Sequence, residues 1–230
     1  MKTTSIHDRA LIRLISDAHH KSAVLRGIVD SDAEAELLAE FEGQTNARLL
    51  AEQESTQALD RRELVFIRRA QDLKVYGASH INAAFAYTRS TGNRFNRGAR
   101  GAWYCSYDIF TSAEEVGYHR TRELRYIGIF EDEARCVELL ADFIGDFPDL
   151  AEATDHPALH PDPEIGYSEG QALADTLRRD GHRGLLYPSV RRPGGRCFVA
   201  FEPGIIQNVR PGARWRLIWR GAPQYSLESV

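Results

Sequence analysis

Apolar residues recur at helical intervals in the first sixty residues of the chain. Between Leu11 and Ala18 they lie three and four residues apart, which gives one apolar stripe along a helix. A capping pair followed by acidic residues predicts a second helix over 31–43, and apolar spacing predicts a third over 45–53. We therefore expect residues 1–60 to form an N-terminal helical arm or subdomain.

The pattern changes after residue 60 to short apolar runs separated by turn-forming residues. Such runs are typical of strands, and the amphipathic stretches between them are typical of helices. We predict strands over 64–67, 102–105, 126–130, 184–187, 197–201 and, as a final edge strand, 214–219. We predict helices that begin at Thr111 or Ser112, cover 133–143 and cover 168–179, with a surface loop over 154–163. Helices followed by mixed strands and helices predict the α+β class, with 61–230 as the main domain.

Composition places the chain among ordinary soluble proteins, with 43% hydrophobic and 27% charged residues in 230. The formal net charge of −4 argues against broad binding to a phosphate backbone. Nucleic-acid binding through the arginines of 178–179, 191–192 and 214–220 is therefore a weak alternative. The three cysteines form no CxxC pair, and the N-terminus has no signal-peptide pattern, so we expect a cytoplasmic protein.

The segment from Gly92 to His119 carries the strongest candidate chemistry. It places Arg94 in a glycine-rich turn, Tyr104 on an apolar strand and Glu115 near a helix start. A guanidinium pairs with phosphate, an aromatic ring stacks or hydrogen-bonds, and a carboxylate stabilises a cationic sugar. Each residue also has a plainer interpretation: a surface arginine, a core tyrosine, and one of two adjacent acids that complement the helix dipole.

Other polar residues offer weaker signals. His119 lies four residues after Glu115 and can share its helix face, but no HExxH pattern accompanies the pair, and we expect no metal. Ser168 is placed at a predicted helix N-cap, with a glutamine three residues later, which is typical of a capping box. Ser189 lies in a turn and can bond backbone groups there. Neither serine lies in a GxSxG sequence, which disfavours a hydrolase nucleophile.

Four segments carry a further signal: the strand Phe66-Ile67-Arg68-Arg69, the turn Gly92–Asn96, the Tyr104, Glu115 and His119 series, and the stretch 168–203. Taken together, these segments resemble the RES-domain family, toxins of bacterial toxin–antitoxin pairs. The resemblance covers about 63–203. Two departures stand out: Phe95 replaces a common tryptophan, and Ser112 replaces a common alanine.

The resemblance implies an ADP-ribosyltransferase-like fold with a mixed β-sheet core and flanking helices. It implies NAD+ as the substrate and cleavage of the nicotinamide–ribose bond. It also implies a neutralising antitoxin protein with an Xre-like helix-turn-helix. Carried over by position, the catalytic residues are Glu115, Arg94 and Tyr104, and the NAD+-binding residues are Arg68 or Arg69 and Ser168 or Ser189.

The acceptor of the ADP-ribose group decides the type of enzyme. Transfer to a protein gives an ADP-ribosyltransferase, water gives a glycohydrolase and phosphate gives a phosphorylase. We place transfer to a protein first because the long N-terminal arm favours protein contacts. A non-catalytic nucleotide-binding or interaction module is the alternative from a different class, and it would tolerate the loss of Glu115.

Overall fold

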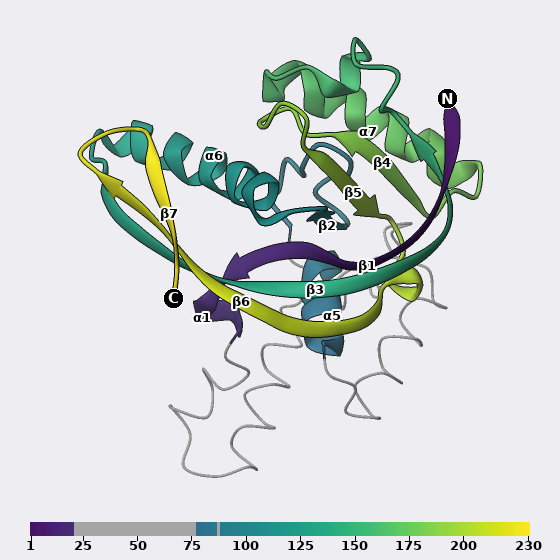
Figure 1. The fold of residues 1–230 in the computed structure, drawn as a ribbon. Helices are drawn as coiled ribbons and strands as arrows, with labels where there is room; N and C mark the ends of the chain where they lie inside the picture. Colours follow the sequence, from purple (N-terminus) through teal and green to yellow (C-terminus); the bar gives the residue numbers. More distant parts are fainter. Residues whose placement is uncertain (21–76, 87) are drawn as a thin grey trace.

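The computed structural model describes residues 1–20, 77–86 and 88–230 (Figure 1). Within them the chain forms a seven-stranded sheet with helices packed on it, which confirms the α+β class. The strands are β1 (Lys2–Ser16), β2 (Trp103–Ser106), β3 (Glu131–Asp149), β4 (Gly184–Pro188), β5 (Arg196–Ala200), β6 (Gln207–Arg220) and β7 (Tyr225–Ser229). The helices are α1 (Asp17–His20), α5 (Ala78–Ala86), α6 (Ile109–Ile127) and α7 (Pro163–Arg179), with short 3-10 turns η2 (Pro157–Leu159) and η3 (Pro203–Ile205).

The strand order is β1-β2-β5-β4-β3-β6-β7, and a further pairing of β1 with β3 closes the first five strands into a ring. β1 runs antiparallel to β3 from the pair Lys2–Asp149 to the pair Ser16–Cys136. β6 lies antiparallel along the N-terminal part of β3, and β7 follows outside it. Figure 1 shows these long strands as curved ribbons, with α6 over one part of the sheet and α7 over another.

Three apolar clusters hold the layers together. The first lies inside the ring, where the Phe143 and Phe198 rings meet at 4.7 Å between centroids. The second packs the inner face of α7, including Leu177, on β4 and β5. The third packs α6 through Leu124 on Trp219 of β6. Burial of each large apolar side chain contributes roughly 1.5–3 kcal/mol, so these clusters fix the helices that carry the site.

Helix α6 begins at Ile109, two residues before Thr111 and three before Ser112, the two predicted starts. Asp108 is its N-cap and accepts a hydrogen bond from the backbone N–H of Thr111 at 2.9 Å. Gly128 ends the helix in the left-handed region at φ 77°, so the strand predicted over 126–130 is wrong. The sequence did not reveal Asp108 as the N-cap because Thr111 and Ser112 are also good capping residues. The apolar run 126–130 resembles a strand, but the glycine within it is a common helix terminator.

Two predicted helices are strands. Residues 11–16 belong to β1, whose edge pairs along the whole C-terminal half of β3, and only Asp17–His20 are helical. Residues 11–15 of β1 are buried or half-buried on both faces, so their apolar positions do not alternate and their spacing resembles that of a helix. Residues 133–143 lie within β3, where four consecutive residues, 136–139, are buried. A strand covered on both faces has no alternating pattern, and the length of this one favoured a helix.

The remaining strand predictions fare better. Those over 102–105, 184–187 and 197–201 are confirmed as β2, β4 and β5. The alternating run 214–219 lies in β6, but β7 outside it is the edge strand. The helix predicted from Ser168 begins at Pro163, and the loop before it contains η2. Residues 21–60 and the strand predicted over 64–67 lie outside the described residues, so the division at residue 60 stays a prediction. Among the described helices, none is long and apolar enough to cross a membrane.

Candidate active site

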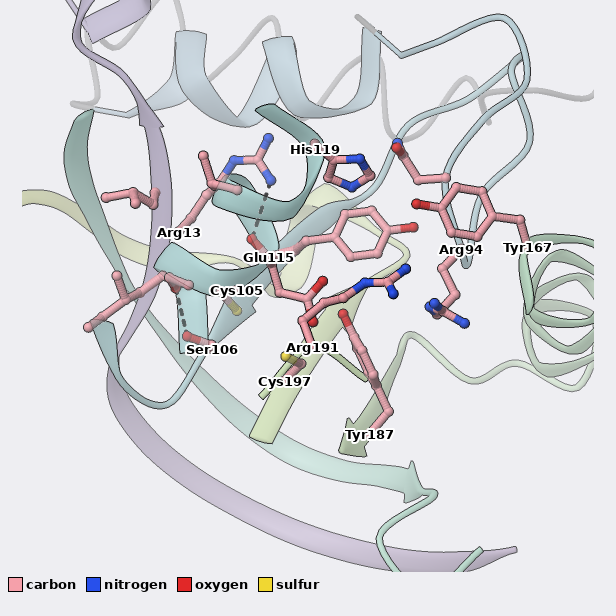
Figure 2. Close-up of a pocket in the computed structure, with 16 residues that line it drawn as sticks. Arg13, Arg94, Cys105, Ser106, Glu115, His119, Tyr167, Tyr187, Arg191 and Cys197 are labelled. Atoms are coloured by element: carbon pink, nitrogen blue, oxygen red, sulfur yellow. Dashed lines mark hydrogen bonds between the residues drawn. The ribbon is translucent and has the colours of Figure 1, made fainter. Parts of the chain in front are cut away.

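A cavity of about 240 Å³ lies where α6 and α7 approach the strands β1, β2 and β5. It brings together Arg94, Tyr104 and Glu115, the three residues that the sequence singled out. Figure 2 shows the Glu115 carboxylate and the guanidinium groups of Arg191 and Arg94 directed into one space, with Tyr167 beside Arg94. The other lining residues are Ile12, Arg13, Leu14, Asn93, Cys105, Ser106, Ser112, Val116, His119, Tyr187 and Cys197.

Glu115 is held in place by Ser189. The Ser189 hydroxyl donates to a Glu115 carboxylate oxygen at 2.7 Å. The same hydroxyl oxygen accepts the backbone N–H groups of Arg191 and Arg192, each at 3.1 Å. Because those two N–H groups occupy the oxygen's lone pairs, its single proton is directed at Glu115. Glu115 is therefore oriented by a turn whose own backbone orients the serine.

Opposing effects set the protonation of Glu115. Burial raises the pKa of this carboxyl, whereas the Ser189 hydrogen bond and the charges of Arg191 and Arg94 lower it. Burial prevails, and the pKa lies above its ordinary value. An ionised carboxylate at this position is poorly solvated and is compensated by fixed protein dipoles and cations, which suits stabilisation of a developing positive charge.

Arg94 is almost fully buried, at 6% exposure, and is built into the structure rather than placed on the surface. Its Nη1 donates to the carbonyl oxygens of Ala158 and His160 at 2.7 and 2.9 Å. Two glycines of α7 allow the turn to approach: a Cβ at Gly166 would collide with Arg94 Nη1, and one at Gly170 would collide with the Arg94 carbonyl oxygen. Such close approach requires glycine, and it fixes the direction in which the guanidinium enters the cavity.

The Tyr104 hydroxyl makes two hydrogen bonds with the turn that carries Arg94. The oxygen accepts the Phe95 backbone N–H at 3.0 Å, and the proton is donated to Asn96 Oδ1 at 2.8 Å. Burial strongly raises the pKa of this phenol, so it stays neutral at physiological pH. Tyr104 thus serves as an aromatic wall and as a brace for the turn.

Arg191 and His119 were not assigned as site residues from the sequence. The Arg191 guanidinium lies 3.4 Å from the centroid of the Tyr118 ring, a cation–π stack that holds it beside Glu115. Burial and the nearby charge of Arg89 lower the pKa of His119 to about 4. Arg89 Nη1 lies 3.4 Å from His119 Nδ1, and because an arginine only donates, Nδ1 accepts and Nε2 carries the proton. His119 is a neutral donor at the cavity wall.

Arg13 also lines the cavity, and the helix predicted over residues 11–18 gave no reason to assign it to a site. It lies on β1, donates to the Tyr104 carbonyl oxygen at 3.3 Å and stands 5.0 Å from the centroid of the Trp103 ring. Burial lowers the pKa of its guanidinium. The available signal was the position of this arginine between two apolar residues, Ile12 and Leu14. Three of the lining residues, Arg13, Arg94 and Arg191, are cations, against the single carboxylate Glu115, so the cavity attracts anions.

Of the other residues that the sequence singled out, some lie at the cavity and others do not. Ser168 is exposed in the second turn of α7, where Asp162 is the N-cap, and it does not line the cavity. Ser189 is therefore the serine that the structure brings to Glu115. Arg68 and Arg69 lie outside the described residues. Ser112, one of the two departures from the family pattern, donates at 2.8 Å to the carbonyl oxygen of Ile12 and so ties α6 to β1 beside Arg13.

The fold and the cavity define an α+β protein with a half-buried carboxylate among arginines and tyrosines, an arrangement suited to an anionic ligand that develops positive charge. A family model, the RES domain, matches residues 67–220, and the chain belongs to the RES-domain family. This family is associated with toxin–antitoxin systems and generally consists of NAD-related enzymes. Comparison with the curated proteins gives no match. β1, which supplies Arg13, precedes the matched residues.

Proposed function

We propose that this chain is the toxin of a toxin–antitoxin pair, and that it binds NAD+ in the Glu115 cavity, cleaves the nicotinamide–ribose bond and transfers ADP-ribose to a protein. One observation carries the proposal: the half-buried Glu115 carboxylate, fixed by Ser189, shares one cavity with Arg94 and Arg191. A site built only to bind a nucleotide would gain nothing from a half-buried carboxylate beside an anionic ligand.

The chemistry follows from the charge of the leaving group. The C1′–N bond of NAD+ breaks with its electron pair moving to the nicotinamide nitrogen, so nicotinamide leaves as a neutral base and needs no general acid. The ribose carbon becomes oxocarbenium-like, as in glycoside cleavage. Glu115 stabilises that positive charge, and its raised pKa also suits it to accept the proton released by an attacking hydroxyl or amine.

The arginines account for substrate binding. A diphosphate carries two negative charges, and guanidinium groups match phosphate oxygens by paired N–H donors. Arg94 and Arg191 line the cavity together with Glu115, and Arg13 reaches it from β1. The Tyr104 and Tyr167 rings offer apolar faces for the nicotinamide half. His119 supplies a neutral Nε2–H donor in the same wall.

The acceptor and the partner complete the proposal. A protein side chain is the first candidate acceptor, and water and inorganic phosphate are the other outcomes of the test. An antitoxin with an Xre-like helix-turn-helix is the expected partner, because toxins of this kind are encoded with the protein that silences them. Its binding should prevent NAD+ cleavage by the purified toxin.

The test is incubation of the purified full-length chain with NAD+ alone, with phosphate and with cell lysate. Nicotinamide release and protein labelling are followed by mass spectrometry. We expect a discrete labelled protein in lysate, with loss of both signals in Glu115→Gln and normal signals in Glu169→Gln, an exposed carboxylate on α7. Free ADP-ribose or its phosphate as the main product would overturn transfer and retain NAD+ cleavage. Absence of nicotinamide release in every condition would overturn the enzymatic proposal.

A further inference from the structure

A second cavity, of about 320 Å³, lies on the neighbouring face of α6. Its walls come from α6, including Glu114 and Tyr118, and from the turn into β7, including Gln224 and Tyr225. Arg191 lines this cavity as well as the first. We propose that the second cavity binds the adenosine half of the dinucleotide, with Arg191 at the diphosphate between the two halves; this inference rests on the function proposed above.

The position of the two cavities supports a divided substrate. Glu114 and Glu115 are adjacent in sequence, and successive helix positions point in different directions. Glu115 therefore lines the first cavity and Glu114 the second. Arg191 stacks on Tyr118, which itself lines the second cavity. One fixed guanidinium at the boundary is where the negatively charged link of a dinucleotide would have to pass.

The volumes of the two cavities also support a substrate divided between them. Pockets that enclose a whole drug-sized ligand run to roughly 300–1,000 Å³, and the first cavity, at about 240 Å³, falls below that range. It suits one nucleotide half rather than both. The second cavity follows α6 from Glu114 to Arg125, which is about 16 Å of helix at 1.5 Å per residue. The two spaces together fall within the range expected for a complete ligand.

The lining of the second cavity fits a nucleoside. The Glu114 carboxylate is an acceptor for ribose hydroxyl groups, and an acidic residue plays that part in other dinucleotide sites. The Gln224 side chain can both donate to and accept from a purine edge. Tyr118 and Tyr225 add aromatic surface.

The walls of this cavity are preformed. Trp219 Nε1 donates to Thr121 Oγ1 at 3.0 Å, and Thr121 Oγ1 donates to the Pro223 carbonyl oxygen at 3.4 Å. Gly117 meets the Tyr225 ring so closely that a Cβ would collide with it. Binding sites for small molecules are usually formed before the ligand arrives, and this one is held by the same contacts that dock β7 on α6.

The test separates the two halves of the substrate. Gln224 is exposed at the rim of the cavity, so Gln224→Trp fills the space without disturbing the core. Glu131→Trp, at an exposed position of β3 outside either cavity, is the matched control. Nicotinamide release is measured from NAD+ and from nicotinamide mononucleotide, which lacks the adenosine half. Binding of ADP is measured by calorimetry.

We expect Gln224→Trp to raise the KM for NAD+ about tenfold or more with kcat within about twofold, and to leave the kinetics of nicotinamide mononucleotide unchanged. ADP should bind wild type and Glu115→Gln alike, and Gln224→Trp more weakly by about tenfold. An unchanged KM for NAD+ and unchanged ADP binding in Gln224→Trp would overturn the inference while NAD+ cleavage stands. Loss of protein labelling alone, with an unchanged KM, would overturn it by making this cavity the acceptor site. Absence of nicotinamide release from wild type would instead overturn the proposed function.

Discussion

The Ser189 hydroxyl donates a 2.7 Å hydrogen bond to the Glu115 carboxylate, across 74 positions of sequence. The turn after β4 therefore determines where the carboxylate on α6 points. Two backbone N–H groups direct the serine, and the serine directs the acid. This chain of contacts makes Ser189 a positioning residue for Glu115, because its one proton is already committed there and is not free for a substrate.

Ser189→Ala should reduce kcat for nicotinamide release by about 10²-fold with little change in KM, because a removed hydrogen bond leaves Glu115 misplaced and more readily protonated. The acidic limb of the pH–rate profile should move to higher pH, since the serine hydrogen bond is one of the effects that lower the pKa of Glu115. The control is Ser168→Ala, the exposed serine on α7. A defect in the control and none in Ser189→Ala would reverse the assignment.

Gly170→Ala tests how the Arg94 turn is seated. The added Cβ would collide with the Arg94 carbonyl oxygen, so α7 and the turn must separate. We expect a loss of about 1–3 kcal/mol in the free energy of unfolding, because overpacking outweighs the better helix propensity of alanine, and a raised KM for NAD+. Denaturant unfolding and steady-state kinetics measure the two effects. Glu169→Ala, one residue earlier and exposed, should change stability by less than about 0.5 kcal/mol.

Part of the site could be predicted because its residues are close in sequence. Arg94, Tyr104 and Glu115 lie within one segment that folds locally into turn, strand and capped helix, and all three line the cavity. Arg13 and Arg191 come from distant segments that only the sheet brings together. No local pattern reveals which arginine faces a cavity, so neither was assigned. Ser189 was a candidate, but its partner became evident only in three dimensions.

The fold was predictable where strands are short and helices are capped. β2, β4 and β5 are compact apolar runs, and α7 is amphipathic. The helices predicted over parts of β1 and β3 were wrong for one shared reason. The two strands pair with each other over most of their lengths, and long-range pairing satisfies the backbone whatever the local spacing suggests. Burial on both faces, over residues 11–15 of β1 and 136–139 of β3, then removed the alternation that identifies a strand.

Glu115→Gln should raise the free energy of unfolding while it reduces kcat for nicotinamide release by about 10³-fold. Burial raises the pKa of Glu115 in the folded state, so its stabilising contribution is complete below the unfolded pKa and is lost as pH rises through the folded pKa. At pH 8 the wild-type protein holds an ionised, poorly solvated carboxylate that the glutamine variant lacks. Denaturant unfolding at pH 8 and pH 4 should therefore give a stability advantage for Glu115→Gln that shrinks at pH 4. A variant less stable than wild type at pH 8 would contradict this.

His119 should make the fold sensitive to mild acid. Its pKa is lowered from 6.5 to about 4, mainly by burial and then by the Arg89 charge, so its contribution is present above pH 6.5 and is lost as pH falls through 4. Between pH 4 and pH 6.5, His119 binds a proton in the unfolded chain and stays neutral in the folded chain. His119→Asn keeps an acceptor for Arg89 and cannot titrate. Unfolding curves from pH 8 to pH 4 should show wild type losing up to about 3 kcal/mol relative to its value at pH 8 beyond any loss in His119→Asn. Parallel pH profiles for the two proteins would mean that His119 has the same pKa in the folded and unfolded chains, and would contradict this prediction.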